Sequence, residues 1–319
     1  MPVFRSWDRA YLFAMEGAKD ATSARRTAIR NWYSHLLREW TVESRRPMLP
    51  AFATPNPASW DDCHLTTSWL GHSTVLINFY GFWIITDPAL FPRVGIRLPG
   101  VTIGPKRLTA PALRVRELPH IDLVLLSHAH FDHFDLRTLR HIPGRPSAIT
   151  ALRTGDLLRK TKLRDATELR WGERAEARCD AGPLAVSAFP VRHWGARMRH
   201  DNFRGYNGYV LERNGHRIIF GGDTAITDSF ARLRGQARFD LAIMSIGAYD
   251  PWIRSHATPE EAIAMAHAAG ADHIMPVHHQ TFRLSAESFR EPIERFVAAL
   301  SREPERIALR EIGETFQLP

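Results

Sequence analysis

Short apolar segments alternate with turn residues along the chain from Leu65 onwards. Nine of these segments have the length and the content of β-branched and aromatic residues that predict strands. Several are apolar at every position, which is typical of strands covered on both faces. The predicted strands are Leu65–Trp69, Thr74–Tyr80, Phe82–Thr86, Ile121–Ser127, Leu184–Phe189, Gly208–Glu212, Arg217–Gly221, Leu241–Ser245 and His273–Pro276.

Between the predicted strands, five segments show the spacing of apolar residues that favours helices. They are Leu136–His141, Thr154–Lys160, Ile226–Leu233, Pro259–Ala269 and Ala286–Leu300. The fourth has the clearest boundaries, because Thr258 can cap its start, two glutamates fall in its first turn and Gly270 follows its end. Helices flanking two sheets predict an α/β fold, with an αββα sandwich as the simplest architecture.

The first 60 residues differ in pattern from the rest of the chain. Two stretches carry apolar residues at helical spacing, and a Pro-rich connector from Pro47 to Pro57 follows them. The second stretch places Trp32, Tyr33 and Trp40 opposite several arginines. Such a face can pack on the main domain, or it can lie on a membrane surface. We therefore expect a helical N-terminal extension at 1–60 and a main domain at 61–319.

The composition is that of an ordinary globular protein, with 44% apolar and 24% charged residues. No apolar run approaches the roughly 20 residues that a membrane-spanning helix needs. Arg5, Asp8 and Arg9 interrupt the apolar core that a secretory signal would have, so we expect a cytoplasmic protein. Cys63 and Cys179 lie far apart and in no metal-binding spacing, which favours reduced thiols.

The formal net charge of +8 favours anionic partners such as phospholipids, phosphorylated small molecules or nucleic acid. However, only four of the 42 basic residues are lysines, and the arginines are spread along the whole chain. A bias in composition explains this distribution as well as a binding patch does. The sequence carries no appended nucleic-acid-binding module, which argues against a nucleic-acid partner.

A dense set of side chains that can bind metal follows the predicted strand at 121–127. The sequence there reads Ser-His-Ala-His-Phe-Asp-His and contains His128, His130, Asp132 and His133. In an H-x-H segment that leaves a strand, two imidazoles can bind one ion, while the next turn brings the Asp-His pair to a second ion. Imidazole nitrogen and carboxylate oxygen suit zinc, and also iron or manganese. The motif therefore predicts a metal site.

Two such ions need about three more ligands, and the ends of later strands offer them. His193, Asp223 and His278 each come shortly after a predicted strand. Taken singly, these histidines could be ordinary surface or core residues, and Asp223 could be a turn residue. Their shared position after strands favours a joint role in metal binding. His279 stays open as a replacement for His278.

The histidine motif resembles that of the metallo-β-lactamase superfamily. Narrower segments, Gly-Pro-Lys-Arg at 104–107 and Gly-Ala-Tyr at 247–249, resemble the branch that contains N-acyl-phosphatidylethanolamine-hydrolysing phospholipase D. The resemblance runs from about Thr67 to Leu318, which is most of the chain. The other matching segments are Trp69–Thr74, Thr86–Pro88, Glu117–Pro119, Gly222–Thr224 and His256–Ala262.

The resemblance implies that seven side chains hold two zinc ions, or iron or manganese in their place. The first ion would take His128, His130 and His193, the second Asp132, His133 and His278, and Asp223 would bridge them. Asp87 would support the ligand loop by orienting its side chains, although an Asp-Pro turn is an equal alternative.

Further roles follow from the same resemblance. His72, Tyr249 and His256 would lie near the substrate, with helix capping and core packing as the alternative for Tyr249 and His256. Asp132, Asp223 and His256 would take part in catalysis, with Asp132 or a water protonating the leaving group.

Two ions that share a water can lower its pKa towards about 7 and provide a hydroxide nucleophile. The prediction is a metal-dependent hydrolase, with phosphodiester cleavage of phospholipase D type on N-acyl phosphatidylethanolamine or related phospholipids as the first hypothesis. The alternative within the same fold is hydrolysis of a lactone or other small ester. Nuclease activity is a third hypothesis, and a non-catalytic metal-binding protein is disfavoured because the ligand set is complete.

Overall fold

The computed structural model describes residues 45–198, 200–235 and 238–318. The chain divides into two compact units, Met1–Met48 and Leu49–Pro319, and the elements below belong to the second. The amphipathic helices expected near the N-terminus fall on residues 1–44, outside the described part, so their role and the boundary at residue 60 stay predictions. Within the described ranges, no helix is long and apolar enough to span a bilayer.

Seven strands form the first sheet, in the order β15-β1-β2-β3-β6-β7-β8. Strands β15, β1, β2 and β3 pair antiparallel, whereas β3, β6, β7 and β8 run parallel. Their bounds are β1 Leu65–Gly71, β2 Thr74–Phe79, β3 Phe82–Thr86, β6 Leu123–Leu126, β7 Ser147–Ala151, β8 Thr167–Leu169 and β15 Thr315–Gln317.

The second sheet has six strands, in the order β14-β13-β12-β11-β10-β9. Strands β9 to β12 pair antiparallel, and β12, β13 and β14 run parallel. Their bounds are β9 Arg174–Cys179, β10 Gly182–Phe189, β11 Gly208–Arg213, β12 His216–Phe220, β13 Phe239–Ser245 and β14 Ala271–Val277. A separate two-stranded sheet consists of β4 Ile96–Leu98 and β5 Val101–Ile103.

The two large sheets share one apolar core. Leu211 and Ile218 of the second sheet lie in the same buried cluster as Leu76 of the first sheet. Because side chains alternate along a strand, their neighbours Val210 and Ile219 point to the other face, where they belong to a second cluster with residues of α4, α5 and α6. Both faces of the second sheet are therefore covered, as its apolar strands predicted.

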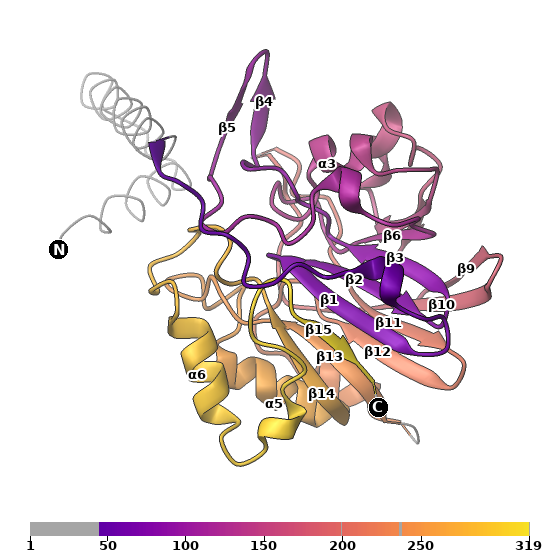
Figure 1. The fold of residues 1–319 in the computed structure, drawn as a ribbon, viewed down its shortest axis with the longest axis vertical. Coiled ribbons are helices and arrows are strands. Elements are labelled where there is room, and N and C mark those ends of the chain that lie inside the picture. Colours follow the sequence, from indigo (N-terminus) through magenta and orange to yellow (C-terminus); the bar gives the residue numbers. More distant parts are fainter. Residues whose placement is uncertain (1–44, 199, 236–237, 319) are drawn as a thin grey trace. The chain divides into compact units, whose positions relative to one another are not determined.

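Helices complete the layers on the outer faces (Figure 1). Helices α4, α5 and α6 pack on the second sheet, while α3 contributes Leu139 to the core of the first sheet. The architecture is the predicted αββα sandwich. The helix bounds are α3 Leu136–His141, α4 Ser229–Leu233, α5 Pro259–Ala269 and α6 Glu291–Ala299, with 3-10 helices at Pro57–Ser59, Val115–Glu117, Gly155–Lys160 and Pro304–Arg306.

Helix α5 begins and ends where its sequence signals predicted. The Thr258 hydroxyl accepts a hydrogen bond from the Glu261 amide, and the Glu261 carboxylate accepts one from the Thr258 amide. This reciprocal cap satisfies two amide groups that the first helical turn leaves without partners. Gly270 ends the helix with a φ of 81°, a left-handed conformation that glycine adopts without strain.

All nine predicted strands are present, and Phe82–Thr86 has the predicted bounds. Three helix predictions need correction. Helix α4 begins at Ser229 rather than at Ile226. The segment at Thr154–Lys160 forms a 3-10 helix rather than an α-helix, and α6 begins at Glu291 rather than at Ala286. The Ala286 amide instead donates to the Asp250 carbonyl, which holds that segment in an irregular conformation. The missed strands are short or polar, as in β4 and β9, and give little periodic signal.

Candidate metal centre

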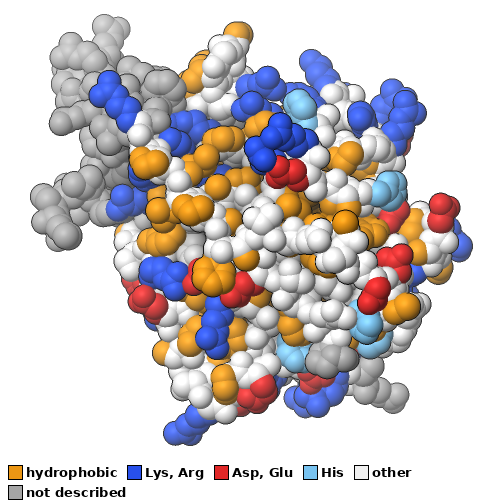
Figure 2. Space-filling model, viewed as in Figure 1, with side chains coloured by type: hydrophobic (Ala, Val, Ile, Leu, Met, Phe, Trp, Pro, Cys, Tyr) orange, Lys and Arg blue, Asp and Glu red, His pale blue; other side chains and the backbone are white. Residues whose placement is uncertain are grey.

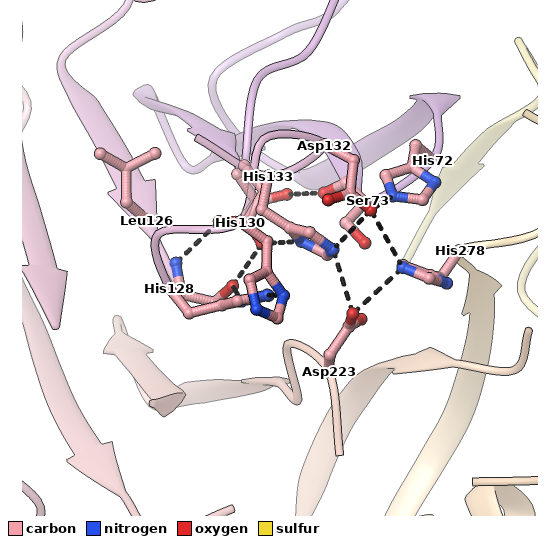
Figure 3. Close-up of polar contacts among 12 residues, drawn as sticks. His72, Ser73, Leu126, His128, His130, Asp132, His133, Asp223 and His278 are labelled. Carbon is pink, nitrogen blue, oxygen red and sulfur yellow. Dashed lines mark hydrogen bonds and ion pairs between the residues drawn. The ribbon is translucent and has the colours of Figure 1, made fainter. Parts of the chain in front are cut away.

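Imidazole and carboxylate side chains converge where strands of both sheets end (Figure 3). The His128–His133 segment follows β6, His193 follows β10, Asp223 follows β12 and His278 follows β14. The turns after these strands bring together residues that are far apart in the sequence. His128, His133, Asp223 and His278 are at most 4% exposed, so their polar atoms depend on one another or on a bound ion.

Three imidazole nitrogens form the first set of candidate ligands. His128 Nε2 lies 2.8 Å from His130 Nδ1, which lies 3.2 Å from His193 Nε2. His193 Nδ1 donates to the Ser255 carbonyl at 2.9 Å, so the lone pair of its Nε2 faces the other two rings. Tetrahedral zinc with bonds of about 2.0–2.1 Å separates its nitrogen ligands by about 3.3 Å. These spacings therefore suit three ligands around one ion.

A second set lies beside the first. Asp223 Oδ2 is 3.1 Å from His133 Nε2 and 3.1 Å from His278 Nε2. Asp132 Oδ2 is 3.5 Å from His133 Nε2 and 3.7 Å from His278 Nε2. Asp132, His133 and His278, together with His72, form a group whose ligand atoms are close enough to hold one ion. Figure 3 shows His133, His278 and Asp132 directed towards Asp223.

Asp223 lies between the two sets. Its Oδ2 is also 3.9 Å from His193 Nε2 of the first set and 3.8 Å from Nδ1 of His256. A carboxylate has two oxygens and about four lone-pair sites, so it can serve two ions at once. Asp223 is therefore close to both sets, and its bridging role stays a prediction.

Several buried atoms in this cluster make no hydrogen bond within the described part of the chain. They include His133 Nε2, His278 Nε2 and Asp223 Oδ1. Buried polar atoms that make no hydrogen bond are costly, and each of these atoms is a good ligand for a divalent cation. The donor set of imidazole and carboxylate fits zinc, iron or manganese. The residues present therefore fit a pair of metal ions.

Burial and neighbouring charges set the protonation of the cluster. Burial lowers the pKa of His130 to about 3 and that of His193 to about 4, so both imidazoles are neutral and keep a lone pair for metal. Burial also disfavours the charged form of His278, but the Asp223 and Asp132 carboxylates together outweigh it and raise the pKa of His278 to about 9. The buried carboxylates thus require positive charge beside them, which protonated imidazoles or metal ions supply.

Asp87 holds the ligand loop in place through hydrogen bonds to Ser127 and His133. Its Oδ1 accepts from the Ser127 amide at 2.7 Å, and its Oδ2 accepts from the Ser127 hydroxyl at 2.5 Å. The same Oδ2 lies 2.8 Å from His133 Nδ1, so that nitrogen donates and His133 Nε2 presents its lone pair to the second set. The supporting role expected of Asp87 therefore agrees with its contacts. Asp87, with a φ of 34°, and His278, with a φ of 65°, both have left-handed backbone, which concentrates at functional sites.

His72, expected to lie beside the substrate, is buried against the second set of ligands. It is 1% exposed, and its Nε2 lies 2.8 Å from Asp132 Oδ2. The His72 amide donates to the hydroxyl of Thr281, which fixes the backbone of this turn. His72 therefore orients Asp132 in the second set and is closed to solvent.

Tyr249, also expected to lie near the substrate, contacts residues of α6. Its hydroxyl donates to Glu291 of α6 at 2.8 Å, and the guanidinium of Arg295 lies 5.0 Å from its ring centroid. These contacts support the alternative interpretation given above, in which Tyr249 packs in the core. His256, by contrast, joins the cluster, with its ring centroid 5.0 Å from that of His193.

The structure decides between the two candidate histidines after β14. His278 faces Asp223 and Asp132, whereas the ring of His279 packs on Trp69 with centroids 4.4 Å apart.

Trp194 is a site residue that the sequence pattern did not predict. Its ring lies 4.4 Å from that of His193 and 4.6 Å from that of His130, so it fixes both imidazoles. Its position directly after His193 was the available signal.

Comparison with known proteins agrees with this geometry. A model of the beta-lactamase superfamily domain matches residues 83–279. An uncharacterized protein of Mycobacterium tuberculosis is 35% identical over 285 residues, which cover 85% of this chain and 74% of that protein. The N-acyl-phosphatidylethanolamine-hydrolyzing phospholipase D 1 of Caenorhabditis elegans is 28% identical over 289 residues, covering 84% of this chain and 80% of that protein.

The fold has solved counterparts. The structure of isothiocyanate hydrolase from Delia radicum gut bacteria aligns with a TM-score of 0.62 at 15% identity, over 79% of this chain and 98% of that chain. This similarity concerns the fold, whereas the family match spans more than half of the sequence and contains most of the candidate ligands. The chain therefore belongs to the metallo-β-lactamase superfamily and is one of its metal-dependent hydrolases.

Proposed function

We propose that this protein is a dinuclear zinc phosphodiesterase of phospholipase D type that cleaves N-acyl phosphatidylethanolamine or a related phospholipid. The observation that carries the proposal is the position of Asp223 Oδ2, 3.1 Å from both His133 and His278 and 3.9 Å from His193. One carboxylate shared by two ligand sets suits a pair of ions, which can stabilise both the attacking and the leaving oxygen of a phosphodiester. The similarity to the nematode phospholipase D supports the choice of substrate.

Two bound divalent ions would supply Lewis acidity and bring the pKa of a shared water towards about 7. The protein would orient these ions through His128, His130 and His193 on one side and Asp132, His133 and His278 on the other. Asp87 and His72 would keep His133 and Asp132 in place, because each holds its partner by a hydrogen bond at 2.8 Å. Water attack at phosphorus would break the bond to the ethanolamine oxygen and release the N-acylethanolamine.

The leaving oxygen needs a proton, and the attacking water loses one that a nearby side chain can relay. Asp132 is the more exposed of the two carboxylates in the cluster, with its side chain 16% exposed against 2% for Asp223. His256 has a buried Nδ1 that makes no hydrogen bond within the described part of the chain. We propose that Asp132 accepts the proton that the attacking water loses and passes it to the leaving oxygen, and that His256 positions the phosphate.

A substrate panel with purified, zinc-loaded protein tests the proposal. We expect release of N-acylethanolamine from N-acyl phosphatidylethanolamine and of p-nitrophenol from bis-p-nitrophenyl phosphate, with no opening of a lactone. Asp223→Asn should abolish both reactions. Asp240→Asn is the matched control, because Asp240 also contacts a histidine, His216 at 2.9 Å, but belongs to no candidate ligand set. Lactone opening without phosphodiester cleavage would replace this proposal with the ester-hydrolase alternative.

A further inference from the structure

The β4–β5 hairpin has an apolar face that no other element of residues 45–198, 200–235 and 238–318 covers. Its register pairs Ile96 with Ile103 and Leu98 with Val101, so these four side chains share one face, while Arg97 lies on the other. Ile96, Leu98 and Ile103 are 45%, 45% and 48% exposed. Figure 1 shows the hairpin projecting from the sandwich. Exposed apolar groups gathered in one place mark interaction sites.

At the base of the hairpin, the backbones of the two strands approach each other closely. A Cβ added at Gly95 would lie 2.1 Å from the Ile103 carbonyl oxygen, and one added at Gly104 would lie 2.2 Å from the Val94 carbonyl oxygen. Only glycine permits this approach, and both residues also have positive φ. At the tip, a Cβ added at Gly100 would meet nothing within 4 Å. The hairpin is thus anchored at its base and open at its tip.

The surroundings of the hairpin are basic. The segment from 91 to 106 contains Arg93, Arg97 and Lys106 and no Asp or Glu. A cavity of about 660 Å³ at the hairpin is lined by further arginines, among them Arg137 and Arg140. Two acidic residues also line it, but Asp135 caps α3 and Asp201 pairs with Arg204. Figure 2 shows blue side chains gathered around the upper part of the molecule, where the hairpin projects.

We propose that the β4–β5 hairpin inserts into an anionic phospholipid surface. Strands of three residues span about 10 Å, and amphipathic elements enter a bilayer interface to a depth of about 5–10 Å. Leu98 and Val101 at the tip would enter the apolar layer, while Arg97 would extend to the lipid phosphates. A protein partner would have to match this face in shape, whereas a lipid surface needs only apolar depth and negative charge.

The hairpin also lies beside the metal centre. Phe131 lines the same cavity, and it stands between His130 and Asp132 in the ligand loop. Arg197 joins the two regions, with its guanidinium 3.9 Å from the Phe131 ring centroid and hydrogen-bonded to the Ala129 carbonyl. A lipid surface held by the hairpin would therefore be close to the ligand loop. The inference concerns docking and does not depend on which bond the enzyme cleaves.

Co-sedimentation of the full-length protein with vesicles tests this inference. We expect binding to vesicles of phosphatidylcholine and phosphatidylglycerol, and weaker binding to phosphatidylcholine alone. Leu98→Ser should weaken binding about tenfold, and Arg97→Gln about fivefold. The controls are Ile226→Ser, whose side chain is similarly exposed at 46%, and Arg302→Gln, an exposed arginine beyond the end of α6. Both should bind like the wild type.

Hydrolysis of bis-p-nitrophenyl phosphate without lipid should be equal in the wild type and in Leu98→Ser, which shows that the variant is folded. Equal vesicle binding by these two proteins would overturn the inference, as would no binding by the wild type. A change in oligomeric state caused by Leu98→Ser would assign the face to a second copy and also overturn it. Vesicle binding that needs Leu98, in a protein that cleaves no phosphodiester, would leave this inference standing and defeat only the proposed function.

Discussion

Asp87 Oδ2 lies 2.8 Å from Nδ1 of His133, and both side chains are completely buried. This contact fixes which nitrogen of His133 carries the proton and leaves Nε2 for the second set of ligands. Carboxylate–histidine pairs of this kind strengthen metal binding by orienting the ring and raising its basicity.

Asp87→Asn is therefore expected to weaken metal binding by about 10–100-fold, because the amide can satisfy Ser127 but holds His133 less firmly. Competition with a chelator measures this affinity. Asp122→Asn serves as the control, since Asp122 also contacts a histidine, His120 at 3.0 Å, away from the cluster. Equal affinity in Asp87→Asn and the wild type would contradict the supporting role.

His128→Ala should remove the ion of the first set and leave that of the second. His128 supplies Nε2 to the first set, whereas Asp132, His133 and His278 remain unchanged. We expect the metal content of the purified protein to fall by about half and turnover to be lost, as a two-metal mechanism requires both ions. Circular dichroism checks that the fold is kept. Full activity in this variant would rule out the first set as a catalytic metal site.

Metal affinity of the second set should rise with pH. The pKa of His278 in the ion-free protein is raised to about 9, so the ring carries a proton at neutral pH that it must release to bind a metal. Protons and metal compete below this pKa, and the competition ends as pH passes about 9. Calorimetry in buffers of different ionisation enthalpy measures the protons released. Binding that is independent of pH in this range would contradict the assignment of His278.

Tyr249→Phe should leave turnover within about twofold of the wild type. The hydroxyl of Tyr249 donates to Glu291, and its loss should lower the free energy of unfolding by about 1 kcal/mol. Steady-state kinetics and denaturant unfolding measure the two effects separately. A large fall in kcat at unchanged stability would instead show that Tyr249 acts at the substrate site.

Thr258→Ala should lower the free energy of unfolding by about 1 kcal/mol, because the hydroxyl caps α5 by accepting from the Glu261 amide. Thr258→Ser keeps an equivalent oxygen and should be close to the wild type. Urea denaturation of the three proteins makes the comparison. Equal stability of the alanine and serine variants would show that this cap contributes little.

The sequence alone determined the features that depend only on residues close together in the chain. Alternating and continuous apolar runs located nine strands, and the cap residues located both ends of α5, because these signals act within a few residues. The histidine motif after β6 was equally local, since its spacing follows from one strand and one turn.

Tertiary structure decided the contacts between distant residues. Adjacent His278 and His279 are equivalent by type, and only the backbone at His278, with its φ of 65°, turns one ring to Asp223 and leaves the other on Trp69. The same holds for His72 and Asp132, which lie 60 residues apart in the chain and 2.8 Å apart in space. The sequence pattern does not give the distance between such residues, because the packing of the two sheets sets that distance.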